Sequence, residues 1–300
     1  MAKRVFITIF QHWKQLSSRM RSATRIFYNR VPKCASKFII TLLTVAQEVS
    51  SQRYKLYHSK KYNKFRLNNT EMNAFLTEID AYDRTERPWV FDQHTYFVNF
   101  KEHNRTNPLY INVVRKPIDL LFSKYHFRRR RDFDPEKMSA KRHNMTYDDC
   151  VFSNQYECTA RYAFRVGSVP YFCGQAEVCT KPSKEAVQVA KRNVNRYYGV
   201  VALMEDLMNG IALLEQTTPK LFKGMTAMAA SMINRRINKR KKKAERPAKA
   251  LAIMEERLQY DNELYAFLKQ RYMLFKRYFQ TESFVKQTLG SINQTVPGHS

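Results

Sequence analysis

Several features that would place a sequence in a common class are absent from this one. No stretch approaches the ~20 consecutive apolar residues of a membrane-spanning helix. The first thirty residues hold only a short apolar patch, residues 5 to 10, which is too short for the core of a signal peptide. From these residues alone, either a targeting segment is missing from the sequence or the protein is intracellular.

Acidic residues are also scarce. The chain has 26 Asp and Glu against 53 Lys and Arg, which gives a formal net charge of +27. Such a surface attracts polyanions, and the release of counterions provides much of the affinity. Nucleic acid, anionic lipid and sulfated or uronic-acid polysaccharide are all suitable partners, so the charge alone does not select one.

The five cysteines include no Cys-x-x-Cys motif with histidine partners, so no metal site is predicted. Four of them form two close pairs, which are Cys150 with Cys158 and Cys173 with Cys179. Two local disulfides are the favoured interpretation, with buried reduced thiols as the alternative. Disulfides imply an oxidising compartment. Four N-x-[ST] sequons also favour the secretory pathway, at Asn68, Asn104, Asn144 and Asn293.

Strands and helices alternate along the chain. An apolar strand at residues 25 to 31 leads into the loop "PKCASK" and a helix from about residue 38 to 49. The near-continuous apolar run at residues 108 to 114 is typical of a buried parallel strand, and a helix with proline in its first turn follows it. Helix, strand and helix then follow from residue 183 to 216. This order predicts an α/β fold with a mostly parallel central sheet flanked by helices.

The other segments have weaker patterns. We expect a short helix at "MNAFLTEI", a strand over residues 89 to 100, a loop-rich region over 131 to 182 and a long helix over 247 to 279. The polar tail after Phe279 is expected to be extended or mobile. The predicted organisation is a basic N-terminal arm or stem remnant (1–24), one main domain (25–280) and a polar C-terminal tail (281–300).

Two of the strand ends carry residues that suit an anion. Lys33 lies in the first loop, and Ala35 and Ser36 offer N–H groups and a hydroxyl at a helix N-terminus. The loop lacks the spaced glycines and the terminal GK[ST] of a Walker motif. Arg115 ends the strand at 108 to 114, and Ser123 follows just over two helical turns later. Each feature alone is as well explained by a solvated loop or surface residue.

The two motifs together resemble a known family. "YNRVPKCAS" and, about 80 residues later, "YINVVRKPIDLLFSKYHF" are similar to the 5′-phosphosulfate loop and the 3′-phosphate motif of the uronic-acid 2-O-sulfotransferases. The likeness continues through "PYFCGQAEVC", "LLEQTTPKLFKG" and "NELYAFLKQRYMLFKRYF", so it covers roughly residues 25 to 280. "PYFCGQ" resembles the uronyl 2-sulfotransferase and Pipe branch more than the heparan branch. Both cysteine pairs fall where the family has disulfides.

The resemblance implies a P-loop-like sulfotransferase fold and an enzyme. The family transfers a sulfuryl group from PAPS, without a metal, to the 2-hydroxyl of a uronic acid in a glycosaminoglycan or related glycan. Lys33 would then act in catalysis by stabilising the leaving 5′-phosphate. The residues expected to hold the donor are Lys33, Cys34, Ala35, Ser36, Lys37, Arg115 and Ser123.

The resemblance also assigns the proton acceptor and two acceptor-binding residues. His94, in "DQHTYFVNF", matches the catalytic histidine of the family and would be the general base. By itself, a histidine at a strand end is more often structural. Arg30 and Arg142 match arginines on the substrate side of the family site. The basic runs "FRRRRDF", "KRHN" and "NRRINKRKKK" could line a groove for an anionic chain.

Four positions depart from the family pattern. Lys116 replaces the acid of an R-D-P motif, Lys37 replaces a hydroxyl residue, Arg131 replaces a glycine, and "NKRKKK" replaces a threonine-containing basic loop. The alternative function is therefore an inactive protein of the same fold that binds anionic glycans. A nucleic-acid-binding protein is a third interpretation, which the cysteine spacing disfavours.

The family also sets expectations for partners and location. The expected acceptor is an anionic polysaccharide of the chondroitin/dermatan or heparan type, and nucleic acid is not expected. Some members of the family are homotrimers, so a homotrimer is a further expectation. The expected location is the Golgi lumen, as a glycoprotein with disulfide bonds.

Overall fold

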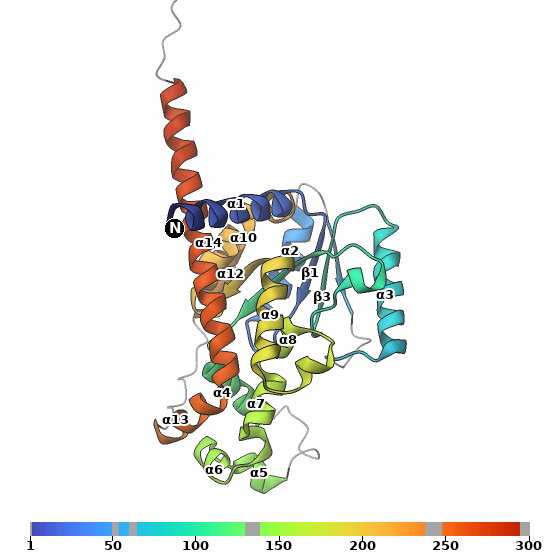
Figure 1. The fold of residues 1–300 in the computed structure, drawn as a ribbon, viewed down its shortest axis with the longest axis vertical. Coiled ribbons are helices and arrows are strands. Elements are labelled where there is room, and N and C mark those ends of the chain that lie inside the picture. The colour runs from blue at the N-terminus through green and yellow to red at the C-terminus, as the bar shows by residue number, and fades with distance from the viewer. Residues whose placement is uncertain (1, 50–53, 60–64, 130–138, 238–247, 295–300) are drawn as a thin grey trace, which may run out of the picture.

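The protein is represented by a computed structural model that describes residues 2–49, 54–59, 65–129, 139–237 and 248–294. A five-stranded sheet forms its centre (Figure 1), in the order β2-β3-β1-β4-β5, with every neighbouring pair parallel. The strands are β1 Arg25–Asn29, β2 Lys55–His58, β3 Trp89–Gln93, β4 Leu109–Val114 and β5 Tyr198–Leu203. The predicted α/β fold with a parallel sheet is confirmed.

Burial explains why these segments form the sheet. Every residue of β3, β4 and β5 is buried, and so is every residue of β1 after Arg25. A parallel sheet is normally covered on both faces, which requires strands that are apolar along their whole length. The edge strand β2 is exposed at both ends and carries polar residues, so its sequence gives no such signal.

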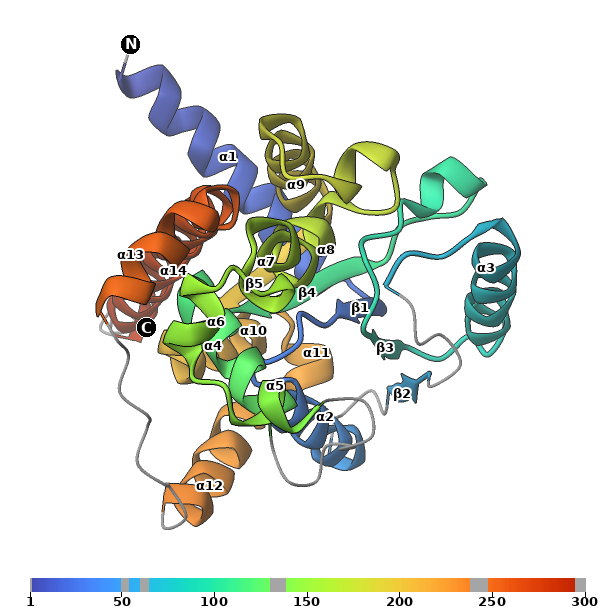
Figure 2. The same cartoon turned by 90° about the horizontal axis from the view of Figure 1, so that it is seen from below.

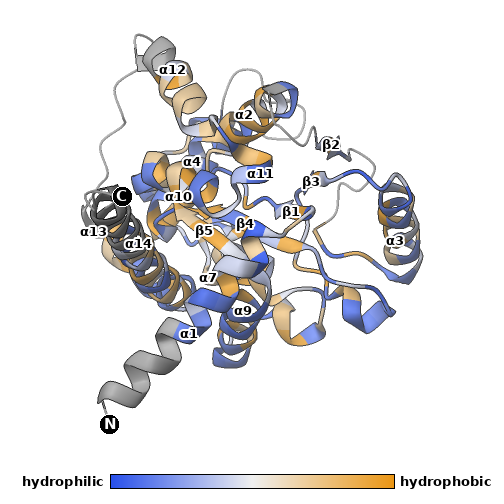
Figure 3. Cartoon of the chain, turned by 90° about the horizontal axis from the view of Figure 1, so that it is seen from above, coloured by the Kyte–Doolittle hydropathy of each residue, from blue (hydrophilic) through white to orange (hydrophobic). Residues whose placement is uncertain are grey.

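Helices cover both faces of the sheet (Figure 2). α2 (Ser36–Val49) and α10 (Leu207–Thr217) lie on one face, with α11 (Pro219–Phe222) and α12 (Met225–Ile237) packed against them. α8 (Val169–Cys173) and α9 (Lys184–Tyr197) lie on the other, beside α14 (Gln259–Gln294). β5 and α10 are largely coloured as hydrophobic in Figure 3, in agreement with their place in the core.

A second, smaller core lies beside the C-terminal ends of the strands. It is built from α4 (Pro117–Arg128), α6 (Tyr147–Phe152), α7 (Ala160–Val166) and α13 (Ala248–Arg257). A disulfide between Cys150 and Cys158 is buried within it. A second disulfide joins Cys173 and Cys179 in the main core. Both predicted disulfides are therefore confirmed.

Several expected element boundaries were wrong. The strand expected over residues 89 to 100 ends at Gln93, and the 3₁₀ helix η1 (Phe100–His103) closes the segment. The short helix expected at "MNAFLTEI" is the longer α3 (Asn69–Asp83), because Asn68 and Glu71 form a capping box at its start. The described part of the region expected to be loop-rich contains short helices, and three of them, α5 (Ala140–Asn144), α6 and α7, are each begun by a Ser or Thr cap.

The two ends of the chain also differ from expectation. The last helix is divided into α13 and α14, and α14 continues to Gln294, so the expectation of an extended tail after Phe279 was wrong. At the other end, α1 (Ala2–Arg21) packs on the domain, with Trp13, Leu16 and Met20 in the main core. The three-part division of the chain stays a prediction. None of the helices among the described residues is both long and apolar enough to span a membrane.

Candidate active site

A large cleft opens at the carboxyl ends of the strands. In open parallel sheets ligands bind at this edge. They bind next to the central strands from which successive connections run to opposite sides of the sheet. Here β1 is central, and the segments after β1, β3 and β4 all contribute to a cleft of about 1390 Å³. Eight of the predicted site residues line it: Arg30, Lys33, Ala35, Ser36, Lys37, His94, Arg115 and Ser123.

The loop after β1 has an unusual backbone. Lys33 and Ala35 both have positive φ angles, 68° and 58°, which non-glycine residues rarely adopt. Such conformations persist where the surrounding structure requires them, and they turn successive N–H groups into a concave, anion-binding surface. α2 begins directly after this loop, at Ser36, whose hydroxyl donates to the carbonyl of Val31 at 3.1 Å. The loop thus combines strained backbone with a helix N-terminus.

The ammonium group of Lys33 lies over an aromatic ring. Its Nζ atom is 3.9 Å from the centroid of the Phe127 ring, which belongs to α4 and also lines the cleft. This cation–π contact keeps the charge within the cleft. Breaking the contact costs only about 0.5–2 kcal/mol. An anion entering the cleft could therefore recruit the lysine.

Arg115 and Ser123 approach the cleft from β4 and α4. Among the described residues, no hydrogen bond or ion pair engages the guanidinium of Arg115. The next residue, Lys116, replaces the acid expected at this position, and its backbone N–H donates to Oε1 of Glu205 at 2.8 Å. Glu205 therefore caps the start of α4 from a different segment, which fixes the segment that carries Arg115.

His94 is held as a neutral imidazole. Its Nδ1 atom lies 2.8 Å from the carbonyl oxygen of Arg30, and because a carbonyl can only accept, Nδ1 carries the hydrogen. Burial, followed by the positive charge of Arg30, lowers the pKa of His94 to about 4. The Nε2 atom thus keeps its lone pair at neutral pH, which is the state that a general base requires.

Two residues that sequence reasoning missed extend this arrangement. Asp92, fully buried, accepts from Nδ1 of His58 at 2.9 Å and pairs with Nε of Arg30 at 2.8 Å. Asp92 lies on β3, two residues before the predicted His94, so its place next to the site could have been indicated by the sequence. His58 ends the edge strand β2, which had no strand signal, so nothing in the sequence pointed to it.

The cleft offers more positive than negative charge to a ligand. Its two acids, Glu205 and Asp206, are both engaged by other residues. Glu205 accepts from the hydroxyl of Tyr265 at 3.1 Å, and Asp206 pairs with Lys276 at 2.9 Å. Lys33, Lys37 and Arg115 face the same space. The arrangement suits a ligand with more than one anionic group.

Two predicted residues do not line the cleft. The thiol of Cys34 is fully buried, and burial raises its pKa to about 12, so only the backbone of this residue is available to a ligand. Arg142 lies on α5, and its guanidinium is 3.9 Å from Oε1 of the buried Glu157. Its predicted role stays a prediction. Arg131 and most of the two longest basic runs lie outside the described residues.

The cleft can therefore bind a polyanion and accept a proton. Arg115 and the strained loop provide two separate places for anionic groups, and His94, which follows β3, lines the same cleft and contacts the carbonyl of Arg30, which follows β1. Within the described ranges, no cluster of three or more His, Cys, Asp or Glu side chains could hold a metal ion.

Comparisons with known proteins point to one family. Residues 18–268 match the sulfotransferase family. The uronyl 2-sulfotransferase of Homo sapiens is 30% identical over 275 residues, which cover 88% of this chain and 66% of that protein. The heparan sulfate 2-O-sulfotransferase hst-2 of Caenorhabditis elegans is 28% identical over 272 residues, which cover 85% of this chain and 81% of that protein.

These matches confirm the resemblance that the two motifs indicated. The uronyl 2-sulfotransferase of Mus musculus is also 30% identical, over 85% of this chain and 63% of that protein. The chain thus spans slightly less than two thirds of the length of the uronyl 2-sulfotransferases it matches. The matched residues include every element that builds the cleft, and the chain belongs to the sulfotransferase family.

Proposed function

We propose that the protein is an enzyme that transfers the sulfuryl group of PAPS to the 2-hydroxyl of a uronic acid in a glycosaminoglycan or related glycan. The observation that carries this proposal is the meeting of Lys33, Arg115 and a neutral His94 in one cleft. The names of the relatives, uronyl and heparan sulfate 2-O-sulfotransferases, support the acceptor class.

The cleft matches the two anionic ends of PAPS. The loop of residues 32 to 37 would hold the 5′-phosphosulfate with its N–H groups and with Lys33 and Lys37. Arg115 and Ser123 would hold the 3′-phosphate from the neighbouring strand, because a planar guanidinium can donate two parallel hydrogen bonds to a phosphate. Apolar side chains of the same cleft, among them Met204 and Leu207, are available to the adenine ring.

The reaction requires a proton acceptor and a cation at the leaving group. Nε2 of His94 would take the proton of the 2-hydroxyl as the hydroxyl oxygen attacks the sulfur. The bond between sulfur and the 5′-phosphate oxygen breaks, and the electron pair passes to that oxygen. Lys33 would neutralise the charge that develops there, and PAP leaves. His94 then releases this proton to solvent, which regenerates the neutral imidazole.

The acceptor would lie on the side of Arg30. Asp92 positions Arg30 through an ion pair of 2.8 Å, and the carbonyl of the same arginine positions His94. Arg142 is a second proposed acceptor contact, and it would have to turn from Glu157 to reach the glycan. The two disulfides support placement in an oxidising compartment, for which we propose the Golgi lumen. A homotrimer stays a prediction.

The test is sulfate transfer with labelled PAPS to chondroitin, dermatan and desulfated heparan chains, followed by disaccharide analysis. We expect label at the 2-position of uronic acid with the wild-type protein and a loss of at least ~100-fold with His94→Ala and with Lys33→Ala. Transfer undiminished in both variants would contradict the residue roles. Binding of glycan without binding of PAP or transfer would instead support the alternative, an inactive glycan-binding protein.

A further inference from the structure

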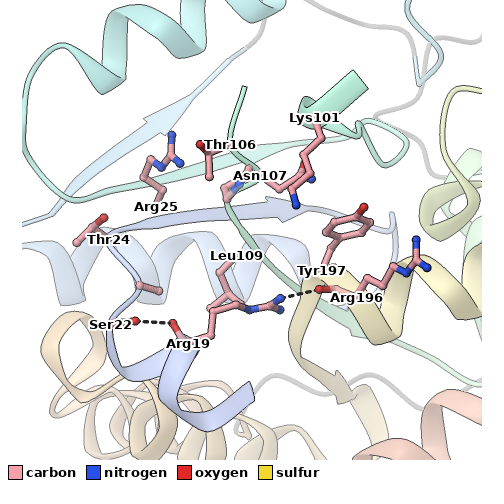
Figure 4. A pocket seen from close by; sticks show the side chains of 12 residues that line it. Arg19, Ser22, Thr24, Arg25, Lys101, Thr106, Asn107, Leu109, Arg196 and Tyr197 are labelled. Carbon is pink, nitrogen blue, oxygen red and sulfur yellow. Dashed lines mark hydrogen bonds between the residues drawn. The ribbon is translucent and has the colours of Figure 1, made fainter. Parts of the chain in front are cut away.

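A second basic region lies at the opposite end of the sheet. A hollow of about 600 Å³ opens where β1 and β4 begin (Figure 4), lined by the end of α1 and by residues from η1 and α9. A neighbouring hollow of about 660 Å³ follows α1 toward α14. Ser22 lines both hollows, so they adjoin along α1, and we call the two together the rear groove.

The rear groove is strongly basic. None of the residues that line the two hollows is acidic. Their basic residues are Lys14, Arg19, Arg21, Arg25, Lys101, Arg196 and Lys220. Asp83, which lies outside the lining, neutralises part of this charge because it pairs with Arg25 at 2.8 Å. The excess of positive charge extends over both hollows and has no place in the reaction proposed for the cleft.

The lining also has the polar and aromatic groups that a sugar polymer requires. Thr24, Thr106 and Asn107 line the first hollow beside Tyr197, whose ring stacks on Phe97 with 5.2 Å between centroids. In Figure 4, Lys101, Asn107 and Tyr197 project into the same space from different elements. In the second hollow, the buried hydroxyl of Ser17 has no hydrogen-bond partner among the described residues.

We propose that the rear groove is a second binding site for a linear sulfated polysaccharide, separate from the cleft. The two joined hollows suit an elongated polyanion better than a single small anion. A lipid surface fits less well, because none of the exposed large hydrophobic side chains among the described residues lines either hollow. The proposal rests on the proposed function in one respect, because this polysaccharide belongs to the class of glycan that is proposed as the sulfate acceptor.

The position of the groove predicts a dependence on chain length. The cleft lies at the carboxyl ends of the strands and the rear groove at their amino ends. Strands of five and six residues separate the two sites by about 17–20 Å at least. Only a polysaccharide longer than this separation can occupy both sites, and such a chain gains affinity because its second contact is intramolecular.

The test uses charge reversal in the full chain with a matched control. Lys101→Glu with Arg196→Glu alters two exposed residues of the groove. Lys184→Glu with Lys223→Glu makes the same change of charge at two exposed residues that line neither the groove nor the cleft. Binding of size-fractionated heparin oligosaccharides is measured without PAPS, and its salt dependence is recorded.

We expect the groove variant to bind long oligosaccharides at least ~10-fold more weakly, with a shallower salt dependence, and the control variant to bind within ~2-fold of wild type. Equal losses in both variants, or none in the groove variant, would overturn the proposal. Groove-dependent binding to vesicles containing phosphatidylserine, without groove-dependent binding of oligosaccharides, would also overturn it.

The design separates this proposal from the proposed function. Binding is measured without donor, so it does not depend on sulfate transfer. If wild-type protein transfers no sulfate but the groove variant still loses oligosaccharide binding, the proposed function fails and the second site stands. In an active enzyme, the groove variant is expected to raise KM for long acceptors and to leave kcat/KM for short acceptors unchanged.

Discussion

Nδ1 of His94 lies 2.8 Å from the carbonyl oxygen of Arg30, a residue whose side chain is itself fixed by the buried Asp92. This contact selects the tautomer of the imidazole, and it places the second nitrogen where a proton can be accepted. The segments that follow β3 and β1 are thereby joined by a hydrogen bond within the cleft.

His94→Ala is expected to lower kcat for sulfate transfer by about 10²–10⁴-fold, because the acceptor hydroxyl loses its base. PAP binding should stay within about 3-fold, since the proposed reaction has His94 contact the acceptor rather than the donor phosphates. His103→Ala, on η1 at the other end of the strands, is the matched control and should keep full activity. An enzyme with His94→Ala that retained more than a tenth of wild-type kcat would exclude the assigned role.

The pH dependence of the free enzyme follows from the same residue. Burial and the charge of Arg30 lower the pKa of His94 from 6.5 to about 4. A histidine is protonated below its pKa and cannot then accept a proton, so kcat/KM should fall as the pH drops through about 4, and not through 6.5.

The charge of the partly buried Lys124 also lowers the pKa of His94, so Lys124→Gln should shift the acidic fall in kcat/KM to higher pH. The measurement is a profile of kcat/KM against pH for both proteins, with circular dichroism to verify folding at each pH. A limb near 6.5 in wild type, or one that does not move in the variant, would refute the electrostatic account.

Glu205→Ala is expected to reduce the free energy of unfolding by about 1 kcal/mol, because the N–H of Lys116 at the start of α4 loses its acceptor. PAP affinity should fall several-fold as Arg115 loses its support. Glu205→Gln keeps a carbonyl oxygen at this place and should restore most of both quantities. Chemical denaturation and calorimetry measure the two effects, and an alanine variant with wild-type values would show that Arg115 is held by other contacts.

The disulfide between Cys150 and Cys158 should stabilise the smaller core, in which both residues are buried. Replacing both cysteines by alanine is expected to cost about 2–4 kcal/mol of unfolding free energy, because the unfolded chain regains conformational freedom. Thermal unfolding of the variant, with and without reductant, checks this. Reductant should destabilise the wild type more than the variant, and equal effects would mean that the bond contributes nothing.

The sequence predicted the parts of the fold that carry a continuous apolar signal. β1, β4 and β5 are buried on both faces, so their composition alone distinguishes them from loops. The edge strand β2 has no such composition, and with it His58 was missed. The continuation of α14 to Gln294 was missed because most residues of this segment are polar.

The site was predictable where short motifs lie next to strand ends. Lys33, Arg115 and Ser123 were expected to meet, and they line one cleft, because the carboxyl ends of parallel strands share one edge of the sheet. The capping of Lys116 by Glu205 joins segments 89 residues apart, and no local pattern reveals such a contact. The place of Arg142 depends on a loop whose register the sequence does not determine.

The central claim is that the cleft binds the donor, and calorimetric titration with PAP tests it most directly. Wild-type protein is expected to bind one PAP per chain in the micromolar range. Arg115→Ala should abolish this binding, because it removes the guanidinium that is free to hold the 3′-phosphate. Lys116→Ala, one residue away, should bind as the wild type does. No binding by folded wild-type protein, or equal binding by the Arg115→Ala variant, would contradict the account.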